Sequence, residues 1–155
     1  MARRAFAHYR RSLPGTLLDA REATLSLLRP TLRKAGLTEP QWRVMRVIEV
    51  EGECEPTDAA QLSLIQLPSL TRIMRDLTAR DLIERNVSPL GLRRSTLKLT
   101  PQGRVLLNAV AAEIAAAFEA PVKRFGEARL ASLMSELRAL SETFAVNDLA
   151  PTQFS

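Results

Sequence analysis

The chain has 155 residues, which is enough for one domain whose core needs no disulfide or metal to fold. Hydrophobic residues make up 46% and charged residues 25%, values that exclude a disordered, collagen-like or purely coiled-coil chain. Basic residues outnumber acidic residues by 22 to 17, so the net charge of +5 favours a polyanionic partner.

Few residues of the chain can carry redox, metal or acid–base chemistry. The single cysteine, Cys54, excludes a disulfide framework and a cysteine zinc site, and the single histidine, His8, disfavours a histidine metal site or a Ser-His-Asp triad. The sequence has no glycine-rich phosphate loop, so we predict that the protein is not an enzyme and holds no cofactor or metal. No uninterrupted apolar run reaches membrane length, and no apolar segment of leader length follows Arg3-Arg4, because His8-Tyr9-Arg10-Arg11 comes instead. We therefore expect a cytoplasmic protein without membrane contact.

Apolar residues at helical spacing predict a first helix over residues 12–35. Ser12 is a suitable N-cap, and Gly36 is a suitable residue to end the helix. Pro30 is expected to kink or split this helix, because proline lacks the N–H that a helix interior needs. A long helix with an apolar stripe needs a partner outside a small domain.

A pattern of shorter helices follows. Thr38 and Gln41 have the spacing of a capping box, which begins a second helix. We expect an acidic turn over residues 51–56, a short helix over residues 59–65 and a further helix from residue 67 to about residue 80.

A β-hairpin is predicted next, because residues alternate over 82–87 and 95–99 and a turn pattern lies between them. A long helix is expected from residue 100 to about residue 120, where Pro121 stops it, and a last helix over residues 127–144.

This element order is that of a winged helix-turn-helix between longer helices, so the predicted fold is mainly α with a small β-hairpin wing. The terminal helices carry more apolar surface than a monomer of this size buries, which predicts a helical dimerisation layer. The expected segments are an N-terminal arm and dimerisation helix (1–36), the winged helix-turn-helix (37–100), further dimerisation helices (101–146) and a flexible tail (147–155).

Positive charge is concentrated on the predicted helix and hairpin over residues 68–104. Eight basic residues accompany three acids there, whereas residues 39–67 carry six acids and two basic residues. A winged helix contacts DNA with this helix and hairpin, so double-stranded DNA is the expected partner. The alternative is an ordinary solvated face, because arginine is common on protein surfaces.

The predicted helix over residues 67–80 has an outward face that suits a major groove. Its apolar face consists of Leu70, Ile73, Met74 and Leu77. The candidate DNA-binding residues on the remaining surface are Ser69, Thr71, Arg72 and Arg75. Hydroxyl and guanidinium groups hydrogen-bond to phosphates and base edges, which supports this assignment.

Four segments match one known pattern in the right order: 37–48 (LTEPQWRVMRVI), 69–77 (SLTRIMRDL), 81–85 (DLIER) and 99–103 (LTPQG). They resemble the MarR family of dimeric winged-helix regulators. Residues 11–23 (RSLPGTLLDAREA) are similar to its HpaR branch, which is named for repressing operons of homoprotocatechuate breakdown. The resemblance implies an obligate homodimer, a palindromic operator, and repression that a small aromatic acid relieves.

The resemblance also indicates residues of the wing. Arg93 matches the family's wing arginine and Arg94 follows it, so both are candidate DNA-binding residues. The family's wing aspartate falls on Gly91 in this chain. That aspartate usually helps to hold the wing arginine, so in this chain either the wing is looser or another acid positions Arg93. We therefore expect the wing contacts to be less certain than the helix contacts.

Arg21 interrupts the apolar stripe of the first helix. A charge in such a place is paired, reaches solvent, or awaits a ligand carboxylate. Trp42, the single tryptophan, is either a core residue or the wall for an aromatic ring. Arg46 lies one turn after Trp42, and His8 can reach the same place from the N-terminal arm. The candidate ligand-binding residues are therefore Arg21, Trp42, Arg46 and His8.

Cys54 lies between Glu53 and Glu55, whose negative charges raise the pKa of a thiol and disfavour the reactive thiolate. Some relatives in the family sense peroxides with a cysteine, but this environment argues against that role here.

The favoured function is a sequence-specific repressor that responds to a ligand. The alternative is a winged-helix scaffold that dimerises without binding DNA. The two differ in salt dependence, because a DNA reader loses affinity steeply as salt rises and a scaffold does not.

Overall fold

The computed structural model describes residues 11–87 and 95–145. The chain forms two compact units, residues 1–115 and residues 116–155, and each is described by itself. The predicted turn at residues 88–91 and the predicted tail lie outside the described residues.

The first helix, α2 (Leu13–Lys34), begins and ends as its sequence predicts. The Ser12 hydroxyl oxygen accepts a hydrogen bond from the Gly15 N–H at 3.3 Å. Gly36 takes a left-handed backbone with φ of +64°, which lets the Leu37 N–H donate to the Leu32 carbonyl at 2.9 Å. Of the two outcomes expected at Pro30, a kink or a split, the split does not occur, because α2 continues through Pro30. Buried residues on both sides of Pro30, at positions 28 and 32, hold both segments against the core.

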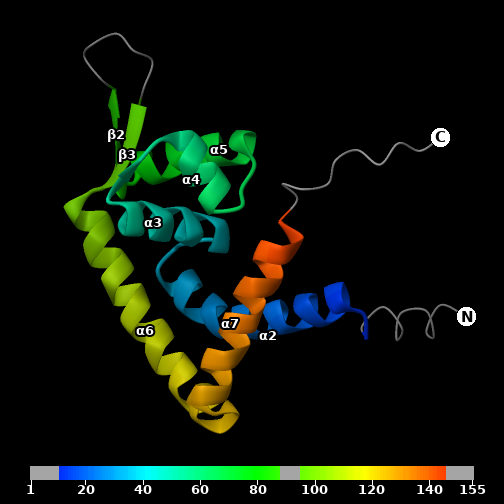
Figure 1. Ribbon diagram of the computed structural model, residues 1–155. Coiled ribbons are helices and arrows are strands. Elements are labelled where there is room, and N and C mark those ends of the chain that lie inside the picture. Colours follow the sequence, from blue (N-terminus) through cyan, green and yellow to red (C-terminus); the bar gives the residue numbers. More distant parts are fainter. Residues whose placement is uncertain (1–10, 88–94, 146–155) are drawn as a thin grey trace, which may run out of the picture. The chain divides into compact units, whose positions relative to one another are not determined.

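The capping box of α3 (Glu39–Glu51) is confirmed. The Gln41 N–H donates to the Thr38 hydroxyl at 3.3 Å, and the Thr38 N–H donates to the Gln41 side-chain carbonyl at 2.8 Å. Two further helices follow, α4 (Pro56–Leu62) and α5 (Leu67–Ala79). Figure 1 shows α4 and α5 beside α3, next to the base of the hairpin that β2 (Ile83–Val87) and β3 (Ser95–Leu99) form.

A three-stranded antiparallel sheet has the order β1-β3-β2, formed by β1 (Glu53–Cys54), β2 (Ile83–Val87) and β3 (Ser95–Leu99). The hairpin prediction is confirmed, with Ile83 opposite Leu99. The predicted acidic turn over residues 51–56 is wrong, because Cys54 pairs with Leu97 on the open edge of β3. The buried side chain of Cys54 accounts for this pairing, since it covers one end of the core.

The long helix α6 (Pro101–Phe125) starts where predicted but does not stop at Pro121. One missing N–H costs a single helical hydrogen bond, and the chain turns only at Gly126, where φ is +100°. By length and composition alone, α6 could cross a membrane, and it is the one such helix among the described residues. Its Leu107 and Val110 are buried in the core of the first unit.

The last helix, α7 (Glu127–Phe144), has the predicted bounds. It buries none of its own residues within this single chain. Large apolar side chains remain exposed on it, namely Leu133, Met134, Leu137 and Phe144.

Candidate functional site

The outward face of α5 is polar and positively charged. Leu70 and Leu77 are fully buried, and Ile73 and Met74 are half-buried, so the predicted apolar face packs inward. The remaining positions leave the candidate DNA-binding side chains exposed: Ser69, Thr71, Arg72 and Arg75. The structure therefore brings these four together on one side of one helix.

Arg72 and Arg75 form no ion pair with any residue in the part of the chain that the structure describes. The first turn of α5 contains no acid. Thr71 donates its hydroxyl hydrogen to the Leu67 carbonyl at 3.0 Å and keeps its oxygen available as an acceptor. This surface thus offers two guanidinium forks to an anionic ligand.

The acid of α5, Asp76, is already engaged. Gln41 of α3 donates its side-chain N–H to an Asp76 carboxylate oxygen at 2.6 Å, and Arg80 lies 3.6 Å from the same oxygen. Arg80 also donates to the Gly36 carbonyl at 2.9 Å. These contacts join the end of α5 to the α2–α3 connection. Sequence reasoning missed them, although a lone acid on a basic helix was the available signal.

Some basic residues of the predicted hairpin lie on its described strands, and others lie outside the described residues. Arg85 and Lys98 are exposed on the described strands β2 and β3. Arg93, Arg94 and Gly91 lie outside the described residues, so their roles remain predictions.

Arg21 is paired and half exposed in this chain. Its guanidinium lies 3.3 Å from a Glu39 carboxylate oxygen, and the side chain is 51% exposed. The other Glu39 oxygen lies 3.0 Å from Arg43. Arg21 is therefore both ion-paired and partly exposed to solvent. Through these pairs, Glu39 links the middle of α2 to the first turn of α3.

Trp42 is half-buried, and its indole N–H is buried without a hydrogen-bond partner among the described residues. A buried polar group without a partner costs free energy, so an acceptor that reached this donor would relieve that cost. Arg46 is exposed on the surface of α3 and pairs with Glu49 instead of turning to Trp42. His8 lies outside the described residues.

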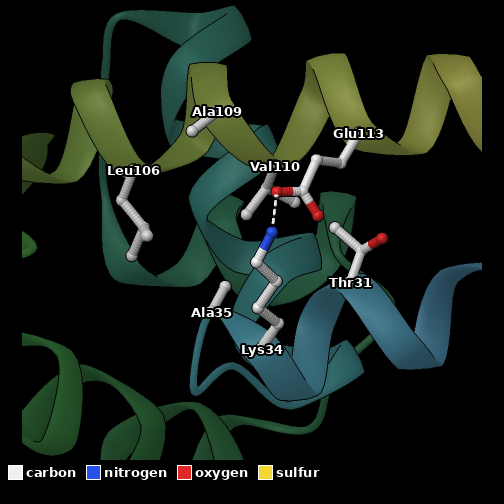
Figure 2. Close-up of a pocket in the computed structure, with 7 residues that line it drawn as sticks. All are labelled: Thr31, Lys34, Ala35, Leu106, Ala109, Val110 and Glu113. Atoms are coloured by element: carbon white, nitrogen blue, oxygen red, sulfur yellow. Dashed lines mark hydrogen bonds and ion pairs between the residues drawn. The ribbon is translucent and has the colours of Figure 1, made fainter.

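A pocket between α2 and α6 does not involve these predicted ligand residues. Figure 2 shows it with Lys34 and Glu113 meeting across it, their charged atoms 2.6 Å apart. Because these charges neutralise each other, the pocket offers no unpaired charge to a ligand. Its lining residues are Thr31, Lys34, Ala35, Leu106, Ala109, Val110 and Glu113.

Cys54 is buried, and this burial is the main cause that raises the pKa of its thiol. The negative charges of Asp58 and Glu51 raise that pKa further. The predicted direction is therefore confirmed, while the responsible acids differ from the sequence neighbours. No group of acidic, cysteine and histidine side chains able to hold a metal ion occurs in the described part of the chain.

Comparison with known proteins places these features in one family. Residues 35–94 match the MarR family model. The chain is 32% identical over 126 residues to the HTH-type transcriptional regulator FarR of Neisseria gonorrhoeae. The aligned region covers 81% of this chain and 86% of FarR. The chain is also 32% identical over 133 residues to the homoprotocatechuate degradative operon repressor of Escherichia coli, covering 86% and 87% of the two chains.

Solved structures of transcriptional regulators are also similar to this chain. Transcriptional regulator PA4135 superposes with a TM-score of 0.79 at 36% identity, covering 86% of this chain and 98% of the other. NadR in complex with 4-hydroxyphenylacetate superposes with a TM-score of 0.75 at 32% identity, covering 84% and 92%. The chain therefore belongs to the MarR family of winged-helix transcriptional regulators, in the branch that includes the homoprotocatechuate repressor.

Proposed function

We propose that this protein is a homodimeric, cytoplasmic repressor that binds a palindromic operator and is released by a small aromatic carboxylic acid. The observation that carries the DNA-binding part is the pair of exposed arginines on α5, Arg72 and Arg75, which have no ion-pair partner among the described residues. In a helix-turn-helix this face enters the major groove.

Binding to operator DNA tests this proposal against the scaffold alternative. Operator affinity should fall steeply as salt rises, because each phosphate contact releases counterions. A scaffold that does not bind DNA should show no operator affinity that falls with rising salt.

Two arginine substitutions should separate base reading from phosphate binding. Arg75→Ala should abolish discrimination between operator and mismatched duplexes, since a base-reading arginine is worth roughly 1–3 kcal/mol per wrong pair. Arg94→Ala should instead weaken binding to all duplexes and reduce the salt slope by about one unit. Fluorescence anisotropy over a salt series measures both.

The matched control is Arg75→Lys, which keeps the positive charge and removes the bidentate fork. It should retain the salt slope of the wild type and still lose discrimination. Wild-type binding by both alanine variants would show that the assigned face of α5 does not contact DNA.

The effector part of the proposal rests on the region between Arg21 and Trp42. A ligand carboxylate can replace Glu39 as the partner of Arg21 or accept the buried indole N–H of Trp42, and the indole ring gives an aromatic ligand an apolar wall. The similarity to NadR, whose structure is a complex with 4-hydroxyphenylacetate, supports an acid of this class. We expect such a ligand to act by changing the angle between each winged-helix region (residues 37–100) and the shared dimerisation helices. It shifts the equilibrium between the two angles only as far as its affinity differs between them.

Arg21→Gln tests this site. We expect near-normal folding and operator binding, because the Arg21 side chain of this ion pair is half exposed and solvent-exposed pairs contribute little stability. Release from the operator by 4-hydroxyphenylacetate should be lost. The matched control is Arg29→Gln, which removes another ion-paired arginine of the same helix and should leave release unchanged. Unchanged release by Arg21→Gln, or a variant that unfolds, would assign Arg21 a structural role.

A further inference from the structure

Asp76 has an arginine about one helical turn away on each side. Arg72 lies four residues before it and Arg80 four residues after it, and side chains at this spacing are neighbours on the surface of a helix. Asp76 and Arg72 are both exposed at the surface of α5. The spacing therefore allows the carboxylate an ion pair with either arginine, and a pair with Arg72 would occupy a guanidinium group of the proposed DNA-binding face.

The structure directs this carboxylate away from Arg72. Arg72 has no ion-pair partner among the described residues, whereas a guanidinium nitrogen of Arg80 lies 3.6 Å from Asp76 Oδ2. That separation exceeds the length of a hydrogen bond, and the same nitrogen donates to the Gly36 carbonyl at 2.9 Å. Arg80 therefore attracts the carboxylate without anchoring it.

The carboxylate is anchored by Gln41 of α3. The Gln41 side-chain N–H donates to Asp76 Oδ2 at 2.6 Å, the one hydrogen bond that a side chain in the described part of the chain makes to this carboxylate. The carbonyl oxygen of the same amide accepts from the Thr38 N–H at 2.8 Å, as part of the capping box. Because the backbone holds the oxygen of the planar amide, its N–H group keeps a fixed direction toward Asp76.

We propose that Gln41 is a positioning residue that holds Asp76 away from Arg72 and so keeps the Arg72 guanidinium free to bind operator DNA. An acid that pairs with a DNA-binding arginine competes with phosphates and base edges for the same N–H donors. The inference rests on the proposed DNA-binding function of α5.

Gln41→Ala tests the inference, because it releases Asp76 to pair with Arg72. Operator DNA must then break that pair in each half-site, so affinity should fall about twofold per half-site and about fourfold for a dimer. The twofold change corresponds to the ~0.4 kcal/mol of an exposed ion pair at this spacing. Fluorescence anisotropy measures the affinity on operators that the wild type selects from a random-sequence duplex pool.

Removal of the acid should reverse this loss. Asp76→Ala eliminates the competing carboxylate and one negative charge near a polyanion, so it should bind at least as tightly as the wild type. Gln41→Ala/Asp76→Ala should bind as tightly as Asp76→Ala. If Gln41 served only to hold α5 in place, loss of either partner would weaken binding and the double variant would not recover.

Thr38→Ala is the matched control for the capping box. It removes the hydroxyl that accepts from the Gln41 N–H and leaves the Gln41–Asp76 hydrogen bond, so it should melt at a lower temperature and bind the operator like the wild type. Gln41→Glu is a second variant, since its carboxylate keeps the cap acceptor and lacks the donor, and it should lose at least as much affinity as Gln41→Ala. Thermal melting of each variant verifies its fold.

Wild-type affinity in Gln41→Ala, or a double variant as weak as Gln41→Ala, overturns the inference while DNA binding stands. Reduced affinity of Asp76→Ala overturns it as well, because the acid would then contribute to binding. A wild type that selects no duplex contradicts the proposed function, and the inference with it.

Discussion

The ends of α2, α4 and α5 share one backbone geometry, although they place different residues in it. Gly36, Leu64 and Asp81 have φ of +64°, +53° and +54° respectively. In each case the N–H of the following residue donates to a carbonyl five positions earlier, at 2.9 Å. A leucine in this position carries backbone strain that a glycine does not, because its Cβ approaches the neighbouring carbonyl.

Leu64→Gly should therefore stabilise the protein. The side chain is 84% exposed, so little packing is lost, and relief of the strain should raise the free energy of unfolding by about 1 kcal/mol. Urea denaturation measures the change. Gly36→Ala is the reciprocal control, which introduces a Cβ into the same geometry and should lower the free energy of unfolding by about as much. Destabilisation by Leu64→Gly would show that the exposed leucine makes contacts that offset its strain.

Residue-level prediction worked where the chemistry is local. The caps at Ser12 and Thr38 and the outward arginines of α5 follow from spacing alone. The partner of Arg21 could not be predicted, because Glu39 is eighteen positions away and lies on another helix. The acids that act on Cys54 are Glu51 and Asp58, three and four positions away, rather than the adjacent Glu53 and Glu55.

At the scale of elements, the LTPQG motif holds the start of α6 against the end of α5. The Thr100 hydroxyl donates to the Asp81 carbonyl at 2.6 Å and accepts from the Gly103 N–H at 2.9 Å. Gly103 packs directly on the Leu82 carbonyl, where an added Cβ would lie 1.9 Å from the oxygen. The motif is thus a junction between α5 and the long helix α6 that follows the hairpin.

Gly103→Ala should destabilise the fold. The Leu82 carbonyl is backbone and cannot rotate away, so α6 must shift, and overpacking of this kind costs about 1–3 kcal/mol. Thermal melting measures the loss. Asn108→Ala, an exposed position on the same helix, is the control and should melt like the wild type. An alanine variant with unchanged melting would mean that α6 is free to move at this junction.

Element prediction failed where a tertiary contact overrides a local signal. The acidic stretch at residues 51–56 looks like a turn, but β1 forms because β3 has an open edge and Cys54 fills a buried place. Pro121 looks like a stop, but α6 continues to Gly126. A single sequence carries no signal for the open edge of β3 or for the continuation of α6 past Pro121.

At the scale of the whole molecule, apolar surface exceeds what one chain buries. α7 has no buried residue, and the first turns of α2 expose Leu13, Leu17 and Leu18. Exposed apolar surface of this extent favours burial against a partner. A second copy of the chain is the partner expected from the family, and two copies would place two α5 helices in successive major grooves, about 34 Å apart.

Sedimentation at micromolar concentration should therefore give about twice the 17.2 kDa mass of the chain. The double variant Leu133→Glu/Leu137→Glu should sediment as a monomer, because each new carboxylate would be buried without a partner in the dimer. Its operator affinity should fall at least a hundredfold, since the two half-sites would no longer be bound by linked lobes. Val50→Glu, which charges an exposed apolar residue outside the terminal helices, should remain dimeric and bind normally. A wild type that sediments as a stable monomer would contradict both the predicted dimer and the predicted palindromic operator. A monomeric double variant with full operator affinity would contradict only the prediction that two linked half-sites are needed for binding.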